Sequence, residues 1–423
     1  MELASNDRSI AAFTMLGHGV VHWFELAIPI LLVVWLDAFD VSVAVIGLVV
    51  ALGYAPFGLG ALPAGVLVDR FGPKQPILWC LTGMSLSFAA LAVAPSIYAV
   101  ALCLLAWGIA ASVYHPAGLA LISTGVEDRG TVFAWHGIAG NLGIALGPFA
   151  TATLLLFFEW QLVALALAVP GVVATAYGLS ADFDSTAAVD DTPDDAGGSG
   201  RSSLVSDSKS LFASSFLLVF SIVTIVGLYY RGVLTYLPEI LQGLPAMAGV
   251  ALPAGIEELS LGDYFYVGLL VAGMAGQYVA GKLTRRMPVA RGLVVVFGAL
   301  AVLAVVFIPV SGLGLVAVLV YCAVLGFTLF AIEPFYQEAV AVYTPADSRG
   351  LSYGYTYLGM FGLGALNISF GGFLLEYLSL TAFFLSLSVI AVAGTAVAWR
   401  LITAPVGQAA PAAEADAASS DDD

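Results

Sequence analysis

Twelve long apolar runs constrain this chain more than any other feature. They form two sets of six, and a polar stretch separates the sets. A run of about 20 apolar residues crosses the bilayer core, and lipid requires the backbone groups of each run to pair within it as a helix. The sequence therefore predicts an all-α membrane protein with twelve transmembrane helices. The runs cover residues 10–36, 42–66, 76–95, 97–124, 130–158, 161–181, 211–241, 263–284, 290–310, 313–341, 350–376 and 379–402.

The composition agrees with this prediction. Of the 423 residues, 61% are hydrophobic and only 10% are charged. A soluble globular protein carries about 25% charged residues, so this chain cannot cover a water-facing surface with polar groups. Twelve spans with short loops fill the chain, which excludes a large soluble domain.

The basic residues predict the orientation of the helices. Twelve of the thirteen lysines and arginines fall on one side of the predicted bundle. Basic loops stay on the cytoplasmic side of a membrane protein. We therefore predict a multi-pass protein of the plasma membrane with both termini cytoplasmic. The twelve residues are Arg8, Arg70, Lys74, Arg129, Arg201, Lys209, Lys282, Arg285, Arg286, Arg291, Arg349 and Arg400.

The polar stretches divide the chain into four parts. We expect an N-terminal six-helix bundle over 1–181, a flexible acidic cytoplasmic linker over 182–210, a C-terminal six-helix bundle over 211–402 and a disordered acidic tail over 403–423. The linker is rich in Asp, Ser, Gly and Thr, which cannot bury a core. Acid-rich, lysine-poor loops also suggest a halophilic source, because high salt screens their charge.

The two predicted bundles resemble each other at four matching points. The offset between matched positions rises from 209 to 220 residues along the chain, as modest loop insertions would require. Parallel six-helix repeats place a substrate site between the repeats, near the middle of the membrane. The matched segments are His22–Pro29 with Arg231–Pro238, Ala64–Gly72 with Ala280–Pro288, His115–Pro116 with Glu333–Pro334, and Arg129–Gly130 with Arg349–Gly350.

The segment between the second and third runs, "GVLVDRFGPK", resembles the signature of the major facilitator superfamily. It departs from that signature only at Pro73, where a basic residue is usual. The resemblance implies two pseudo-symmetric six-helix bundles and a cytoplasmic latch that forms when the transporter opens outward. Its glycines would permit close helix approach and a tight turn. The implied latch residues are Gly65, Asp69, Arg70, Gly72 and Lys74, with Arg129 as their partner.

Three stretches of the N-terminal half are similar to the fosmidomycin-resistance group within that superfamily. They are "GHGVVHWFELAIP", "ASVYHPAG" and "RGTVFAWHGIAGNLGIALGP". The last stretch ends in Gly143-xxx-Gly147-Pro148, which matches half of a motif typical of exporters and favours export. The same glycines are also compatible with a stripe of small residues that packs against another helix.

Seven ionisable residues inside the predicted spans are the candidates for the substrate and proton pathway. An ionisable group in the hydrocarbon costs several kcal/mol unless it faces protein or water, so it is a functional candidate by default. Arg231 is the one basic residue off the cytoplasmic side and needs a carboxylate partner, Glu25 or Glu333, or an anionic substrate. Packing within helix interfaces remains the alternative for the histidines. The candidates are His18, His22, Glu25, His115, His136, Arg231 and Glu333.

These features predict a secondary active transporter of a small organic solute, anionic or drug-like, that is coupled to protons, with export as the favoured direction. Sodium is the alternative coupling ion. Two other functions stay open: a non-transporting membrane sensor on the same scaffold, and a divalent-metal transporter, because His18, His22 and Glu25 share one helical face.

We expect no enzyme activity, because the chain has neither an HExxH helix nor a G-x-S-x-G turn. We also expect no cofactor, no resident metal and no nucleic-acid partner. The expected partners are the small-molecule substrate, a proton or sodium ion and the lipid bilayer. A monomer is the expected working form.

Overall fold

The computed structural model describes residues 3–188, 201–248, 260–344 and 349–404. The N-terminal half is built from eight helices over the described residues. They are α1 (Ser5–Phe39), α2 (Val43–Leu59), α3 (Ala61–Phe71), α4 (Lys74–Leu91), α5 (Ile97–Ala111), α6 (Tyr114–Gly125), α7 (Arg129–Leu155) and α8 (Trp160–Ser180).

The second half follows the same plan after a short extra helix. Its described elements are α9 (Arg201–Phe212), α10 (Phe216–Gln242), α11 (Pro245–Ala248), α12 (Leu261–Leu283), α13 (Val289–Ser311), α14 (Leu315–Tyr343), α15 (Arg349–Tyr357), the π-helix η2 (Leu358–Leu363), α16 (Leu366–Tyr377) and α17 (Leu380–Leu401).

The twelve predicted spans are confirmed. Among the described residues, nine helical segments are long and apolar enough to cross a membrane, and the bent pair α2–α3 makes a tenth. The helices α4, with 18 residues, and α12, with 23, complete the set. Several spans begin with a side-chain cap of the first turn, as Ser42, Ser96, Asp128 and Ser379 each accept a backbone N–H three residues on.

Three spans are broken, which the apolar runs do not reveal. The second span bends by 49° between α2 and α3, at Gly60. The fourth is interrupted between α5 and α6, because Pro116 has no N–H to bond the carbonyl of Ser112. The eleventh passes through η2, a π-helical stretch of the kind often found at functional sites.

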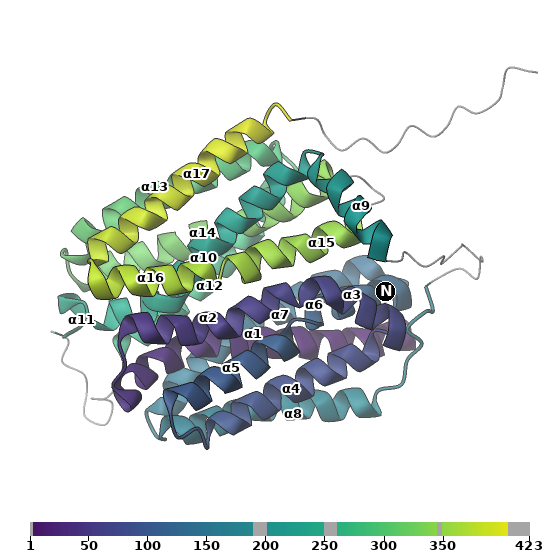
Figure 1. Cartoon of the computed structure of the whole chain (residues 1–423), viewed down its shortest axis with the longest axis horizontal. Coiled ribbons are helices and arrows are strands. Elements are labelled where there is room, and N and C mark those ends of the chain that lie inside the picture. The colour runs from purple at the N-terminus through teal and green to yellow at the C-terminus, as the bar shows by residue number, and fades with distance from the viewer. Residues whose placement is uncertain (1–2, 189–200, 249–259, 345–348, 405–423) are drawn as a thin grey trace, which may run out of the picture.

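The helices form two bundles that lie one above the other, with α1–α8 in the lower layer and α10–α17 in the upper layer (Figure 1). Equivalent pairs pack in the same way in both: α4 on α8 matches α13 on α17, and α2 on α5 matches α12 on α14. Between the bundles, α2 contacts η2 and α16, α7 contacts α12, and α1 contacts α10. The two pseudo-symmetric six-helix bundles, predicted from the repeat and implied by the signature segment, are confirmed.

The most extensive helix contact of the lower bundle joins α1 and α7, and glycines permit their close approach. A Cβ on Gly143 would overlap the backbone of Gly19, and a Cβ on Gly147 would overlap the backbone of Trp23. Gly143 and Gly147, which match half of the exporter motif, therefore have a packing role. They place α7 close to the polar face of α1.

The predicted flexible linker differs from the structure in its first part. Residues 181–188, called the strap below, lie against the N-terminal bundle. Asn6 donates its side-chain N–H groups to the carbonyl oxygens of Gly125 (2.8 Å) and Asp184 (3.1 Å), and its Oδ1 accepts from the Asp184 N–H (2.8 Å). Hydrogen bonds from Thr186 lower the pKa of Asp184 below its usual range. Composition alone missed these contacts, because backbone groups make most of them.

The last part of the predicted linker also differs, because residues 201–210 belong to α9. The Tyr355 hydroxyl donates to Ser208 Oγ at 2.8 Å, and the rings of Phe212 and Tyr355 lie 4.8 Å apart. These contacts join α9 to α15. Residues 189–200 and the predicted tail from 405 onward lie outside the described residues.

We expect Asn6→Ala to release the strap. The substitution removes three hydrogen bonds, each worth about 1 kcal/mol, so amide exchange at Asp184 should rise about tenfold or more. Hydrogen–deuterium exchange of the strap peptide measures this change. Ser5→Ala, at an exposed position one residue away, is the matched control. Equal exchange in both variants would contradict the docking of the strap through Asn6.

Candidate functional site

A chain of hydrogen bonds joins three ionisable residues on one face of α1. Their spacing of four and then three residues places the side chains one above another. His22 Nδ1 lies 2.6 Å from Glu25 Oε2, and His22 Nε2 lies 3.1 Å from His18 Nε2. His18 Nδ1 then lies 2.7 Å from the carbonyl oxygen of His136. Glu25, His22 and His18 form a continuous line of hydrogen-bonded groups, called the triad below.

The triad is joined to the other bundle through Arg231. Its Nη2 lies 2.5 Å from Glu25 Oε1, and the two side chains are only 3% and 2% exposed. Glu25 belongs to α1 and Arg231 to α10, so this buried ion pair bridges the two halves of the protein. The sequence offered Glu25 and Glu333 as partners of Arg231, and the structure selects Glu25.

Aromatic rings enclose the Arg231 guanidinium. Its central carbon lies 4.5 Å from the ring centroids of both Tyr54 and Phe361, and 5.5 Å from that of Tyr230. Such rings attract a cation through their negative faces. Phe361 lies in η2, so the π-helical stretch of the eleventh span supplies one wall of this enclosure. Tyr54 also donates a hydrogen bond of 2.6 Å to the backbone carbonyl of Glu25.

The remaining two histidines lie beside the triad. His136 of α7 stacks on His18 with 3.9 Å between ring centroids and 7° between planes. Its Nε2 lies 3.3 Å from the hydroxyl of Tyr114, which itself donates to the carbonyl of Thr14. His115 of α6 meets His18 and His22 edge-on at 5.4 and 5.5 Å. All four histidines of the chain therefore gather in one place.

Glu333, the other carboxylate offered as a partner of Arg231, has a different partner in the structure. It accepts a hydrogen bond of 2.6 Å from Gln277 Nε2, a residue of α12 that the sequence did not single out. Arg231 is not its partner, although the two groups interact electrostatically. A nearby amide can satisfy a buried carboxyl group as well as a cation can, and spacing along the chain does not reveal which is nearer.

Several buried polar atoms around this site have no hydrogen-bond partner. Among the described residues they include Arg231 Nε, His115 Nδ1, Gln277 Oε1 and the Tyr266 hydroxyl. Tyr266 and His115 interact electrostatically with both Glu25 and Arg231. Most buried polar groups are paired, and an unpaired one costs about 1–3 kcal/mol. Groups from three different helices, α6, α10 and α12, thus present free hydrogen-bonding capacity toward one region.

The histidines alone also resemble a metal site. Ligand nitrogens of His18, His22 and His115 lie within 4.8 Å of one another. However, both ring nitrogens of His22 and both of His18 already face protein partners. A metal ion would have to displace these hydrogen bonds, so the donor set fits the proton better than a divalent cation.

The predicted latch is not formed in this structure. Arg129 donates instead to the backbone carbonyls of Ala188 (3.1 Å) and Val126 (3.3 Å), and Lys74 donates to Ala181 at 2.6 Å. Asp69 is exposed and makes no ion pair among the described residues. The strap carbonyls, which the sequence could not place, take the basic groups that the latch would use.

The two glycines of the signature segment, Gly65 and Gly72, have different surroundings in the structure. Gly72 has a φ of +71°, so the predicted tight turn needs a glycine there. Gly65 makes no close helix approach in this conformation, because a Cβ on that residue would meet no atom within 4 Å. Arg70 lies over the Phe71 ring at 5.2 Å and is otherwise exposed.

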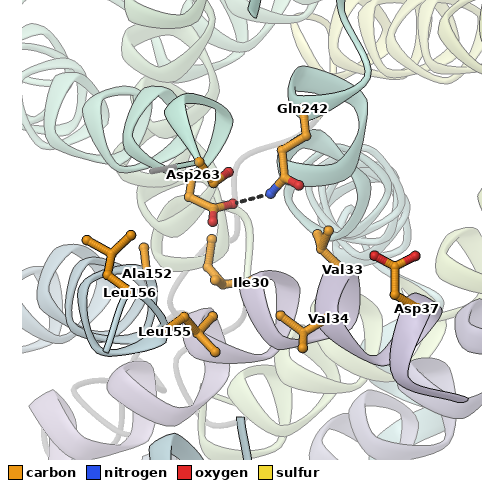
Figure 2. A pocket seen from close by; sticks show the side chains of 10 residues that line it. Ile30, Val33, Val34, Asp37, Ala152, Leu155, Leu156, Gln242 and Asp263 are labelled. Atoms are coloured by element: carbon orange, nitrogen blue, oxygen red, sulfur yellow. Dashed lines mark hydrogen bonds between the residues drawn. The ribbon is translucent and has the colours of Figure 1, made fainter. Parts of the chain in front are cut away.

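A cavity of about 230 Å³ lies between the bundles near the ends of α1, α7, α10 and α12, away from the basic loops (Figure 2). Gln242 Nε2 donates to Asp263 Oδ1 at 2.8 Å, and Asp37 lies on the opposite side of the cavity from Asp263. Nearby, the Thr153 and Tyr264 hydroxyls meet at 3.2 Å between α7 and α12. The cavity is lined by Ile30, Val33, Val34, Asp37, Ala152, Leu155, Leu156, Gln242, Ser260 and Asp263.

Comparisons with known proteins agree with this architecture. The family model of the Major Facilitator Superfamily matches residues 12–369, and the chain belongs to this family of membrane transporters rather than to any class of enzyme. The prediction from the signature segment is confirmed. The closer likeness to the fosmidomycin-resistance group stays a prediction.

Solved structures show the same fold at low sequence identity. A bacterial homologue of the human lysosomal transporter Spinster, inward-facing and occupied, matches with a TM-score of 0.70 and 14% identity over 95% of this chain and 98% of that one. A mutant of the nucleoside transporter NupG matches with a TM-score of 0.72 and 15% identity over 93% of this chain and 99% of the other.

Curated relatives match over part of their length. A gallate transporter of Pseudomonas putida is 30% identical over 179 residues, which is 38% of each chain. The uncharacterized transporter YqjV of Bacillus subtilis (strain 168) is 29% identical over 157 residues, 37% of each chain. The matched regions thus span less than two fifths of these relatives.

Proposed function

We propose that this protein moves a small organic anion across the cell membrane by alternating access, coupled to protons, with Arg231 as the anion-binding group. The proposal rests on one observation: the Arg231 guanidinium at the interface between the bundles uses only part of its hydrogen-bonding capacity. Arg231 bonds Glu25 through Nη2, while its buried Nε has no partner. Arginine binds carboxylates best through two parallel N–H groups, so a substrate carboxylate would make a better partner than Glu25 does here.

The surroundings of Arg231 favour an anion with an aromatic body. Tyr54, Tyr230 and Phe361 already flank the guanidinium, and they offer flat faces to a ring held by its carboxylate. The gallate transporter among the relatives is consistent with this class, since gallate is a hydroxylated aromatic carboxylate. The free acceptor Gln277 Oε1 and the free hydroxyl of Tyr266 would receive the polar groups at the other end of such a substrate.

Displacement of Glu25 by the substrate supplies the coupling. Once Arg231 turns to the substrate, the freed carboxylate of Glu25 is a buried charge, which is costly without a partner. Binding a proton removes that charge. Glu333, held by Gln277 within the C-terminal bundle, is a second group that can take up a proton. We infer a proton rather than sodium because the triad consists of groups that exchange protons.

Alternating access would proceed by rocking of two units, 1–181 and 211–402, about the central site. Because the basic residues lie on one side of the bundles, we propose that both termini are cytoplasmic. We also propose that the protein lies in the plasma membrane and works as a monomer. The basic groups Arg129 and Lys74 would exchange strap carbonyls for Asp69 as the latch forms. Export remains the expected direction from the half motif at Gly143–Pro148, although packing against α1 also accounts for those glycines.

A counterflow assay distinguishes a transporter from a non-transporting sensor. Purified protein in proteoliposomes, preloaded with unlabelled hydroxybenzoate, should accumulate external labelled hydroxybenzoate, and the uncharged methyl ester should not compete. Saturable binding of the acid without any counterflow would favour the sensor. Counterflow of divalent cations instead of the acid would favour the metal transporter.

A further inference from the structure

The hydrogen-bond chain along α1 ends at an atom that can only accept. The carbonyl oxygen of His136 has no proton, so His18 Nδ1 must carry the hydrogen of the 2.7 Å bond. At the other end, Glu25 Oε1 accepts from Arg231, which favours the carboxylate form of Glu25. Between these ends lie the contacts of His22 with Glu25 and with His18. The directions of the hydrogen bonds at the two ends of the chain can therefore be assigned.

A count of protons follows from the three contacts. Each contact needs one hydrogen between its two heavy atoms: His18 to the carbonyl, His22 to His18, and His22 to Glu25. An ionised carboxylate and two neutral imidazoles supply only two hydrogens on these atoms. The geometry as observed therefore requires one hydrogen more.

We propose that Glu25, His22 and His18 together bind one excess proton, and that this proton closes the hydrogen bond between the two histidines. This inference rests on the proposed function and names the proton site within it. His22 carries hydrogens on both ring nitrogens, and it donates to Glu25 and to the lone pair of His18 Nε2. Without the proton, two lone pairs would face each other at 3.1 Å, so one ring would have to turn away.

The groups around the triad do not compete with it for the proton. His136 donates its Nε2 hydrogen to the Tyr114 oxygen, because the Tyr114 hydrogen is used on Thr14. His115 Nδ1 has no partner, and its ring meets the triad only edge-on. The other facing charged groups are Arg231 and Glu333, which interact with the triad from α10 and α14. None of the hydrogen bonds of these groups competes for the proton.

The position of the proton couples it to substrate binding. When an anion replaces Glu25 on Arg231, the proton can move along the 2.6 Å contact. The N–H bond at His22 Nδ1 breaks, an O–H bond forms at Glu25 Oε2, and His22 becomes neutral. The net charge does not change in this step, because the charges of His22 and Glu25 disappear together and the substrate anion stays paired with Arg231.

Nitrogen-15 NMR of histidine-labelled protein in lipid nanodiscs tests the proposal directly. The chain has four histidines, all at this site, so labelling reports nothing else. We expect one imidazolium among the four rings at neutral pH, and a scalar coupling between two histidine nitrogens across the N–H···N bond. His18→Met should remove the coupling and the imidazolium signal together. His136→Gln should keep both, because His18 bonds the backbone of that residue.

Four neutral rings, or an imidazolium without internuclear coupling, would overturn the proposal. If His18→Met fails to fold, the wild-type spectrum alone still decides between these outcomes. The proposed function fails separately: a shared proton in a protein that shows no proton flux with any organic anion would remove the function and keep the proton site. Proton-coupled transport with four neutral rings would do the reverse.

Discussion

Arg231→Ala is expected to abolish transport of organic anions and to destabilise the protein. A charge-assisted hydrogen bond is worth about 1.5–3 kcal/mol, so losing two of them from the bound anion should lower transport more than about 100-fold. The substitution also leaves Glu25 buried without its cation, which costs about 3–5 kcal/mol. Initial uptake rates in proteoliposomes and the thermal unfolding temperature measure the two effects.

A double variant separates the two effects of that substitution. Arg231→Met with Glu25→Gln removes both charges of the pair, so most of the lost stability should return. Transport should stay at the background level, because the anion still lacks its binding group. Recovery of transport together with stability would mean that Arg231 acts only in folding.

Gly58→Val should block the conformation described here while leaving each bundle intact. Gly58 of α2 lies against Gly362 of η2, and a Cβ on Gly58 would overlap the backbone nitrogen of Gly362. Backbone atoms cannot turn aside as a side chain can, so the bundles must separate along this line. We expect transport to fall more than about tenfold, since a barrier of 1.4 kcal/mol already has that effect.

The matched control for this prediction is Gly268→Val. Gly268 lies in α12, and a Cβ there would meet no atom within 4 Å. Its transport should equal that of the wild type. Thermal unfolding of both variants verifies that they fold, and cysteine cross-linking between α2 and α16 reports how far the bundles separate. Normal transport by Gly58→Val would show that this close contact is not part of the transport cycle.

Most of the fold could be predicted from the sequence, because lipid leaves few options for an apolar run. The positions of the spans follow from hydropathy, and their pseudo-symmetry follows from the repeat. The breaks are local and escaped prediction. Pro116 was visible in the fourth run, but nothing in the sequence showed that the eleventh would contain a π-helix. The strap was missed because it is held by backbone carbonyls, which carry no residue-specific signal.

The candidate site was predicted in part. Charge in an apolar run identified the four histidines, Glu25 and Arg231, and the structure brings them together. Tyr54, Phe361 and Gln277 were missed, since aromatic and amide side chains are ordinary in membrane helices and become informative only in contact with an ion. The sequence left Glu25 and Glu333 open as partners of Arg231, because the choice depends on how α1 of one bundle faces α10 of the other.

The most direct test of the central claim is proton flux driven by an organic anion. Proteoliposomes that hold a pH-sensitive dye receive hydroxybenzoate from outside, and the internal pH is followed in wild type and in Glu25→Gln. We expect a pH change in the wild type that saturates with the acid and is absent in the variant and with the methyl ester. An identical pH change in both proteins, or anion uptake without any pH change, would contradict coupling through Glu25 and Arg231.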